Sequence, residues 1–106
     1  DVYLNVVGGL RIDEPAIDLG IVASVVSSFR DQALDSQTLF LGEVGLGGEI
    51  RPITQVDVRT REAMKLGFKR CVLPEGNLAK WSGIPGFEVI GVRELGDVLD
   101  QVMARA

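Results

Sequence analysis

The segment from Gly8 to Gly20, which reads GGLRIDEPAIDLG, has the pattern of a strand-to-helix elbow. A strand is expected to end at its leading glycines, and Asp13, Glu14 and Pro15 then open an apolar helix. Enzymes often place a nucleophile at such an elbow, because the side chain is exposed and helix N–H groups lie nearby. Here the residue after Pro15 is Ala16, which has no nucleophilic atom. Helix capping accounts for the two acidic residues, so we assign them no catalytic role.

Basic residues form the second group with possible chemistry. The candidates for contacts to DNA are Arg51, Arg59, Arg61, Lys65, Lys69 and Arg70. Such side chains bind phosphate without sequence preference and with strong salt dependence. The alternative is a solvated helix face with ion pairs four residues apart. Because the net charge is -4, we expect the domain alone to bind DNA weakly.

The composition argues against several other chemistries. Histidine is absent and Cys71 is the single cysteine, so neither a metal site nor a histidine-based triad is expected. An unpaired cysteine also fits a reducing cytoplasm. The glycines at 45, 47 and 48 precede a strand and lack Gly-Lys-Ser/Thr, so they predict a hairpin and not an ATP site. No apolar run is long enough to span a bilayer, and no membrane partner is expected.

Hydrophobic periodicity predicts the elements that carry these residues. Expected strands cover residues 2–7, 38–44, 70–73 and 87–92. A two-residue turn at Gly47-Gly48 is expected to pair residues 44–46 with residues 49–51. Expected helices cover residues 15–29, 55–66 and 94–104. This order predicts one α/β (α+β) domain, residues 1–106, with a mixed sheet and about three helices.

The two outer helices have predicted inward faces. In the first helix these are Ile17, Ile21, Val22, Val25, Val26 and Phe29. In the last helix they are Leu95, Val98, Leu99, Val102 and Met103. Residues 77–85 are expected to be irregular and to be held to the body by Trp81.

Three sequence blocks resemble the proteolytic domain of the Lon protease family: RIDEPAIDLG with its helix, LGEVGLGGEIRPI, and REAMKLGFKRCVLPEGN. The resemblance implies the Lon proteolytic-domain fold, which is similar to domain 2 of ribosomal protein S5. In that family a serine in Asp-Gly-Pro-Ser-Ala-Gly is the nucleophile and a lysine beyond the hairpin is its partner. Lined up through Pro15, the serine position is Ala16. Counted back from Gly67 and Asn77, the lysine position is Arg59.

Both replacements remove a part of the chemistry that the resemblance implies. A Ser-Lys dyad needs a hydroxyl that attacks and an amine that loses its proton. Ala16 supplies no hydroxyl, and Arg59 stays charged at accessible pH and cannot act as a general base. We therefore expect the domain to have no peptidase activity.

The sequence also resembles the C-terminal Lon-like domain of the bacterial RadA (Sms) family. In that family this domain lacks the Ser-Lys dyad. That resemblance implies a fragment of a longer cytoplasmic protein, consistent with a chain that starts at Asp1 without methionine. The parent would carry a zinc finger and a RecA-like ATPase upstream, with Zn, ATP and Mg bound there and no cofactor in this domain. It would work as a hexameric ring on DNA in recombinational repair, with this domain as a scaffold.

Two alternatives stay open. The first is an active Lon-type peptidase with a displaced dyad, in which Ser24 or Ser27 would act with Lys65 or Lys69. These serines lie along a helix without a nearby base in the sequence, which favours a packing role. The second alternative is a relative of the RNA-binding ribosomal protein S5, although the three blocks match the Lon family more specifically.

Overall fold

The computed structural model describes residues 6–7, 10–11 and 15–102. The predicted strand residues 2–5, the predicted cap at Asp13 or Glu14, and Met103 lie outside this part. In chain order the elements are β1 (Val6–Val7), β2 (Leu10–Arg11), the 3₁₀ turn η1 (Pro15–Ile17), α1 (Asp18–Arg30), β3 (Thr38–Phe40), β4 (Glu43–Val44), β5 (Ile50–Arg51), α2 (Val56–Lys65), β6 (Arg70–Pro74), the 3₁₀ helix η2 (Glu75–Lys80), β7 (Glu88–Val92), α3 (Leu95–Asp97) and the π-helical turn η3 (Val98–Val102).

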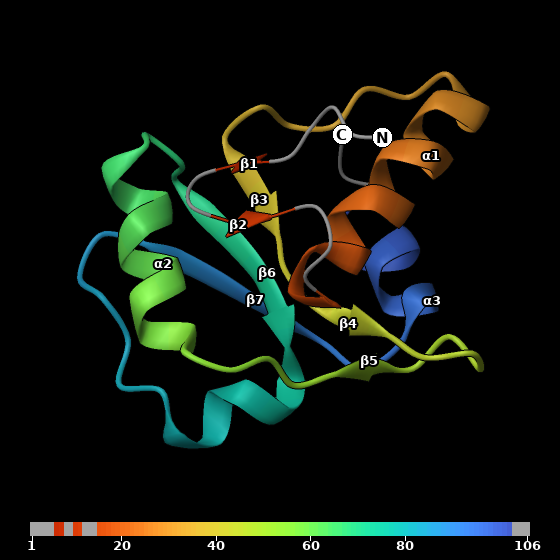
Figure 1. The fold of residues 1–106 in the computed structure, drawn as a ribbon. Helices are drawn as coiled ribbons and strands as arrows, with labels where there is room; N and C mark the ends of the chain where they lie inside the picture. Colours follow the sequence, from red (N-terminus) through yellow and green to blue (C-terminus); the bar gives the residue numbers. More distant parts are fainter. Residues whose placement is uncertain (1–5, 8–9, 12–14, 103–106) are drawn as a thin grey trace.

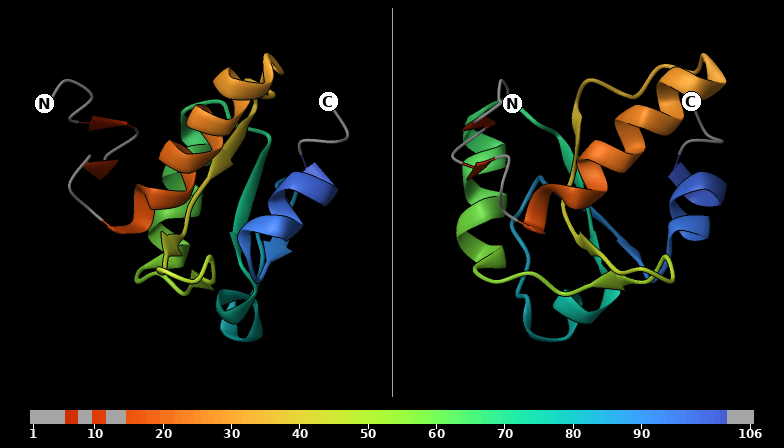
Figure 2. Two further views of the ribbon diagram at one scale, coloured as in Figure 1. Left: turned by 90° about the vertical axis from the view of Figure 1, so that its right-hand side faces the viewer. Right: turned by 45° about the vertical axis from the view of Figure 1, so that its right-hand side comes forward.

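A three-stranded parallel sheet in the order β3-β6-β7 forms the centre of the molecule (Figure 1). The central strand β6 reads RCVLP, and its last four residues are buried, as expected of a parallel strand covered on both faces. Cys71 and Leu73 belong to a core cluster with Ala63 of α2, whereas Val72 packs in a second cluster with Ala23 of α1 and Val98. The sheet therefore has α2 on one face and α1 and α3 on the other, as the right-hand view of Figure 2 shows.

Two antiparallel pairs complete the described fold, β1 with β2 and β4 with β5. The predicted α/β class, with both parallel and antiparallel pairing, is confirmed. The two kinds of pairing lie in separate sheets. The three predicted helical segments are present, and the irregular region after β6 begins with η2.

The predicted strand 38–44 is interrupted at Gly42. Its N–H donates to the Ala16 carbonyl at 2.8 Å, and its carbonyl accepts from the Leu19 N–H at 3.0 Å. These bonds join the chain to the elbow before α1 instead of to a neighbouring strand. A single predicted strand therefore becomes β3 and β4, because the elbow uses the backbone groups between them.

The hairpin turn is one residue longer than predicted. Val44 pairs with Ile50, and the Gly45 N–H donates to the Glu49 carbonyl at 2.9 Å, so three residues from Leu46 to Gly48 form the loop. Gly48 has φ +87°, in the left-handed region that glycine tolerates at this place in a three-residue hairpin loop. The predicted two-residue turn is wrong because Gly48 takes the third, left-handed position of the loop, so that Leu46 becomes its first residue.

The predicted inward face of α1 is correct only in part: Ile17 and Val26 pack against the two core clusters, and Val22 is partly buried. Leu19 and Ala23 are buried, whereas Ile21, Val25 and Phe29 are 44%, 62% and 91% exposed. The bonds between the elbow and Gly42 set the rotation of the helix, and the small Gly20 allows it to approach the Phe40 carbonyl closely. Nearly every face of this helix is apolar, so periodicity alone did not identify the buried one.

The C-terminal helix follows its predicted pattern in the described part. Val98 is buried, and Leu95 and Leu99 are partly buried against the same cluster. Its start at Glu94 forms a capping box with Asp97. None of the helices in the described part of the chain is long and apolar enough to cross a membrane.

Candidate functional site

The elbow residue Ala16 lies in the 3₁₀ turn Pro15–Ile17 and is buried. Pro15 suits the first helical positions because its missing N–H would have no partner there. The bonds to Gly42 fix this turn against the connection between β3 and β4. Asp18 follows in the first turn of α1, where its Oδ2 accepts from the Val44 N–H at 3.3 Å. The elbow is therefore bonded to β4 as well as to the connection before it.

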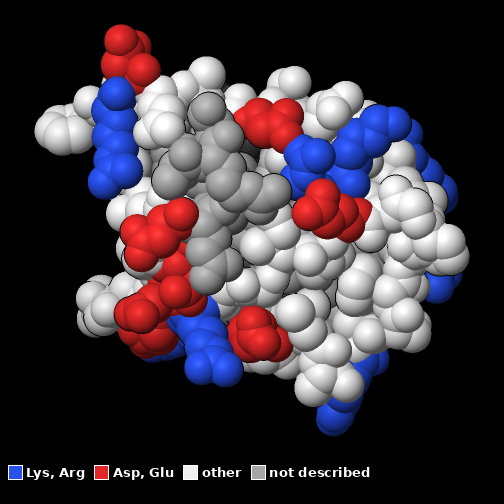
Figure 3. All heavy atoms as spheres, turned by 180° about the vertical axis from the view of Figure 1, so that it is seen from behind, with Lys and Arg blue, Asp and Glu red and all other residues white. Residues whose placement is uncertain are grey.

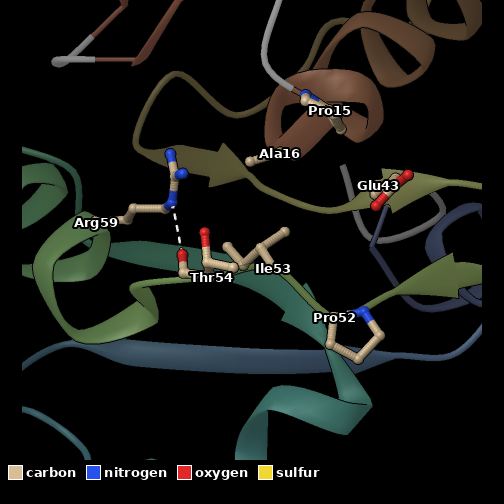
Figure 4. Close-up of a pocket in the computed structure, with 7 residues that line it drawn as sticks. All are labelled: Pro15, Ala16, Glu43, Pro52, Ile53, Thr54 and Arg59. Carbon is tan, nitrogen blue, oxygen red and sulfur yellow. Dashed lines mark hydrogen bonds between the residues drawn. The ribbon is translucent and has the colours of Figure 1, made fainter.

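Arg59 reaches the same region from α2. The helix follows Gln55, which has φ 56° in the left-handed region. The Nε of Arg59 donates to the Thr54 carbonyl at 2.8 Å, which directs the guanidinium back along the helix toward its start. Figure 4 shows this bond and the guanidinium extending toward the Ala16 side of the pocket.

The segment before α2 is held by the side-chain amide of Asn77, from η2. The Ile53 N–H donates to Asn77 Oδ1 at 2.9 Å, and Asn77 Nδ2 donates to the Ile53 carbonyl at 2.9 Å. This pair of bonds satisfies both backbone groups of Ile53, as a strand partner would. Asn77 thereby positions the wall of the pocket between β5 and α2.

Ala16 and Arg59 line one pocket, together with Pro15, Glu43, Pro52, Ile53 and Thr54. Its volume is about 190 Å³ (Figure 4). Among these described residues Glu43 and Arg59 carry the charges, and Thr54 carries the single hydroxyl. The guanidinium can donate hydrogen bonds to a carboxylate or carbonyl, but it cannot take a proton from a hydroxyl. The pocket thus brings together the two positions that the Lon resemblance singled out, with groups that cannot form a Ser-Lys dyad.

Sequence reasoning did not name Glu43 or Thr54 as site residues, although the Lon resemblance places Thr54-Gln55 at the Gly-Gly pair that precedes the family's lysine. In the sequence, Glu43 directly follows Gly42, and Thr54 lies two residues after Pro52. No spacing rule links these two positions to Ala16, because the contact depends on how the β4–β5 hairpin folds back on the elbow.

The structure divides the predicted basic strip into separate environments. Arg70 bonds to the carboxylates of Asp35 and Glu88, the latter at 3.0 Å. Arg51 bonds to Glu49 at 2.8 Å and lies 4.0 Å from Glu43. These two cations are paired within the chain.

Hydrogen bonds and nearby cations hold two of these carboxyl groups ionised. The Gln37 N–H, the Thr38 hydroxyl and Arg70 lower the pKa of Asp35, in decreasing order of importance. Its own backbone N–H and then Arg51 lower the pKa of Glu49. Both pairs persist at neutral pH.

The other three predicted cations besides Arg59 are exposed: Arg61, Lys65 and Lys69. Arg61 and Lys65 lie four residues apart on one face of α2, while Lys69 precedes β6. No ion pair to these three is found among the described residues.

Two further groups considered for chemistry are engaged elsewhere. Cys71 is buried in β6, and burial raises the pKa of its thiol, which keeps it protonated and unreactive. The Ser27 hydroxyl donates to the Gln32 carbonyl just beyond the end of α1. Within residues 6–7, 10–11 and 15–102, no group of three or more histidine, cysteine or acidic side chains is placed to hold a metal ion.

Comparison with protein-family models identifies the family to which the chain belongs. Residues 2–77 match the family model ChlI, described as subunit ChlI of Mg-chelatase. The match extends from the elbow region through the hairpin and α2 to Asn77, and so includes every residue that lines the pocket. The chain belongs to this family.

Among individual proteins, the chain is similar to proteins named DNA repair protein RadA. It is 49% identical to the protein of Halalkalibacterium halodurans over 105 residues, which is 99% of this chain and 23% of that protein. It is 50% identical to the Bacillus subtilis protein over 99 residues, which is 93% of this chain and 22% of that protein. It is 51% identical to the Synechocystis sp. protein over 76 residues, which is 72% of this chain and 15% of that protein. The chain therefore spans less than a quarter of these relatives.

Proposed function

We propose that this chain is a non-catalytic, Lon-like domain of a RadA-type DNA repair and recombination protein. In this proposal the domain holds the subunits of a homo-oligomeric ring together. The repair role is supported by identities of 49% and 50% to RadA proteins over nearly the whole chain. The non-catalytic part is supported by the pocket that Ala16 and Arg59 line together, since the Lon resemblance assigns the two dyad groups to these positions.

ATP, Mg and Zn belong, in this proposal, to other parts of the parent protein, a zinc finger and a RecA-like ATPase. The parent then works as a DNA-dependent ATPase in the bacterial cytoplasm, assembled as a hexamer. Because each subunit contributes one copy of this domain, weak contacts made by one copy are multiplied around the ring.

A direct contact of this domain to DNA is the second part of the proposal. Arg51 and Arg70 are poor candidates, because carboxylates already neutralise them. The exposed Lys69 is the better candidate, since no described acidic group pairs with it. Contacts of this kind are to phosphate, so they add affinity without sequence preference.

The rival function is a Lon-type peptidase with a displaced dyad. The geometry supports it less well, because the Ser27 hydroxyl is used by a backbone carbonyl. Thr54 brings a hydroxyl to the pocket, but the cation beside it is an arginine. A hydroxyl nucleophile needs a base that accepts its proton, and guanidinium does not do so.

A domain exchange tests the proposed function. The matching region of the Bacillus subtilis RadA protein is replaced by this chain, and survival after DNA damage is compared with the wild type and with a deletion of the region. We expect the chimera to restore most of the survival that the deletion loses. A chimera that accumulates as a folded protein but survives no better than the deletion would contradict the proposal.

A further inference from the structure

Charge is divided between two opposite sides of the domain. The α2 edge, defined here by Val58, Arg61, Met64, Lys65 and Leu66, exposes two cations. The α3 edge exposes carboxylates at Glu94 and Asp100, and one cation, Arg93, lies beside them. Seen from behind, Lys and Arg predominate on the side of α2 and Asp and Glu on the side of α3, although each side also shows some residues of the opposite charge (Figure 3). Because α2 and α3 cover opposite faces of the sheet, the two edges cannot meet within one molecule (Figure 1).

Apolar surface accompanies the charge on both edges. Val58, Met64 and Leu66 are exposed on the α2 edge. On the other side, an apolar crevice of about 50 Å³ opens between α1 and α3. It is lined by Leu19, Val22, Ala23, Val26, Leu95, Val98 and Leu99. Such a crevice suits an aliphatic side chain, because it offers no polar partner to water.

We propose that the α2 edge of one copy of this chain binds the α3 edge of the next copy, head to tail. Arg61 and Lys65 then face Glu94 and Asp100, and an aliphatic side chain of the α2 edge enters the crevice. A contact between two different surfaces repeats around a closed ring, whereas a two-fold contact of either edge with itself places like charges together. This inference rests on the homo-oligomer of the proposed function and names the surfaces that build it.

The contributions of the two kinds of contact differ. Exposed ion pairs contribute little to affinity and weaken in salt, so the charges mainly select the partner surface and its direction. Burial of the exposed aliphatic side chains supplies most of the affinity. DNA is the competing partner for Arg61 and Lys65. The subunit contact explains the aliphatic residues beside them, which a phosphate backbone would leave exposed.

Charge reversal with mixing tests the head-to-tail contact. One variant carries Arg61→Glu and Lys65→Glu, so both of its edges are acidic. The other carries Glu94→Lys and Asp100→Lys, so both of its edges are basic. Native mass spectrometry of the chain, in low salt and over a range of concentrations, measures the assembly of each variant and of their mixture. Circular dichroism checks that each variant is folded, since Glu94 takes part in the cap of α3.

We expect the wild type to form oligomers and each variant alone to lose at least tenfold in association. The mixture is expected to form oligomers with equal numbers of both variants, because each edge then meets its opposite charge. Monomeric wild type at every concentration, or a mixture that stays monomeric, would overturn the proposal. The same conclusion would follow if the acidic variant assembles like the wild type and loses only binding to a DNA duplex.

Cross-linking in the parent separates this inference from the proposed function. Lys65→Cys combined with Asp100→Cys should form disulfides between copies under mild oxidation, while each single substitution should not. Cys71 is buried and does not compete. The thiols of the parent's proposed zinc finger are present in both single substitutions, which therefore control for them. If the parent forms a ring and repairs DNA but this pair does not cross-link, the head-to-tail contact is wrong while the repair role remains.

Discussion

Ala16 and Arg59 face the same pocket from the elbow before α1 and from α2. A methyl group stands where the Lon resemblance puts a hydroxyl, and a guanidinium stands where it puts an amine. Each replacement alone removes one reactive group, and together they leave no nucleophile-base pair at these positions. The pocket itself persists, because Gly42 fixes the elbow and Asn77 fixes the opposite wall.

Restoring both groups should restore reactivity. We expect the double variant Ala16→Ser and Arg59→Lys to be labelled by a fluorophosphonate, because a lysine in a partly apolar pocket can lose its proton more easily. Each single variant should be labelled at least tenfold more slowly, since it lacks either the hydroxyl or the base. Equal labelling of Ala16→Ser with and without Arg59→Lys would show that Arg59 does not occupy the partner position.

The amide of Asn77 should contribute strongly to stability. Asn77→Ala removes both bonds to the backbone of Ile53, and we expect the free energy of unfolding to fall by about 2 kcal/mol. Urea denaturation measures this loss. Asn77→Asp is the matched control. Its ionised carboxylate keeps the acceptor for the Ile53 N–H but faces the Ile53 carbonyl without a donor, so its loss at neutral pH should approach that of alanine. In mild acid the protonated carboxyl can donate to that carbonyl, and the loss should become smaller. A loss below about 0.5 kcal/mol for alanine would mean that the two bonds do not hold this wall.

Gly42 should not tolerate a side chain. A Cβ at this position would lie 2.9 Å from Cγ2 of Ile50, with Leu19 and Pro74 also close. We expect Gly42→Ala to destabilise the fold by about 1–3 kcal/mol, because the surrounding core is tightly packed. Thermal unfolding measures the shift in Tm.

Gly96→Ala is the control for that substitution. It lies in α3, and a Cβ there meets nothing within 4 Å. Alanine favours a helix over glycine, so this variant should be neutral or more stable by up to about 1 kcal/mol. Equal losses at both positions would show that close packing at Gly42 is not the cause.

The bonds to Asp35 predict loss of stability in acid. Its carboxyl pKa is lower in the folded protein than the ordinary value of 3.8, so the ionised group stabilises the fold above that pH. This contribution disappears as the pH falls through the lower, folded value. The urea concentration at the midpoint of unfolding is measured from neutral pH to about pH 2. As the pH falls, it should decrease less for Asp35→Asn than for the wild type. Parallel curves for the two proteins would contradict the prediction.

Patterns with one strong local cause were predicted well from the sequence. The apolar run of β6 and the aliphatic spacing of Leu95, Val98 and Leu99 correspond to buried positions. The buried face of α1 was not predictable, because its apolar residues surround the helix and tertiary bonds to Gly42 choose the rotation. The pocket partners Glu43 and Thr54 were missed for a similar reason, since they meet Ala16 only after the hairpin has folded back.

Hydrolysis of casein by the wild-type chain is the most direct test of the claim that this domain does not cut peptides. We expect the rate to equal that of the Arg59→Ala variant and of buffer alone, and to be unchanged by a serine-reactive inhibitor. Turnover above that background, abolished by the inhibitor or by Arg59→Ala, would contradict the account.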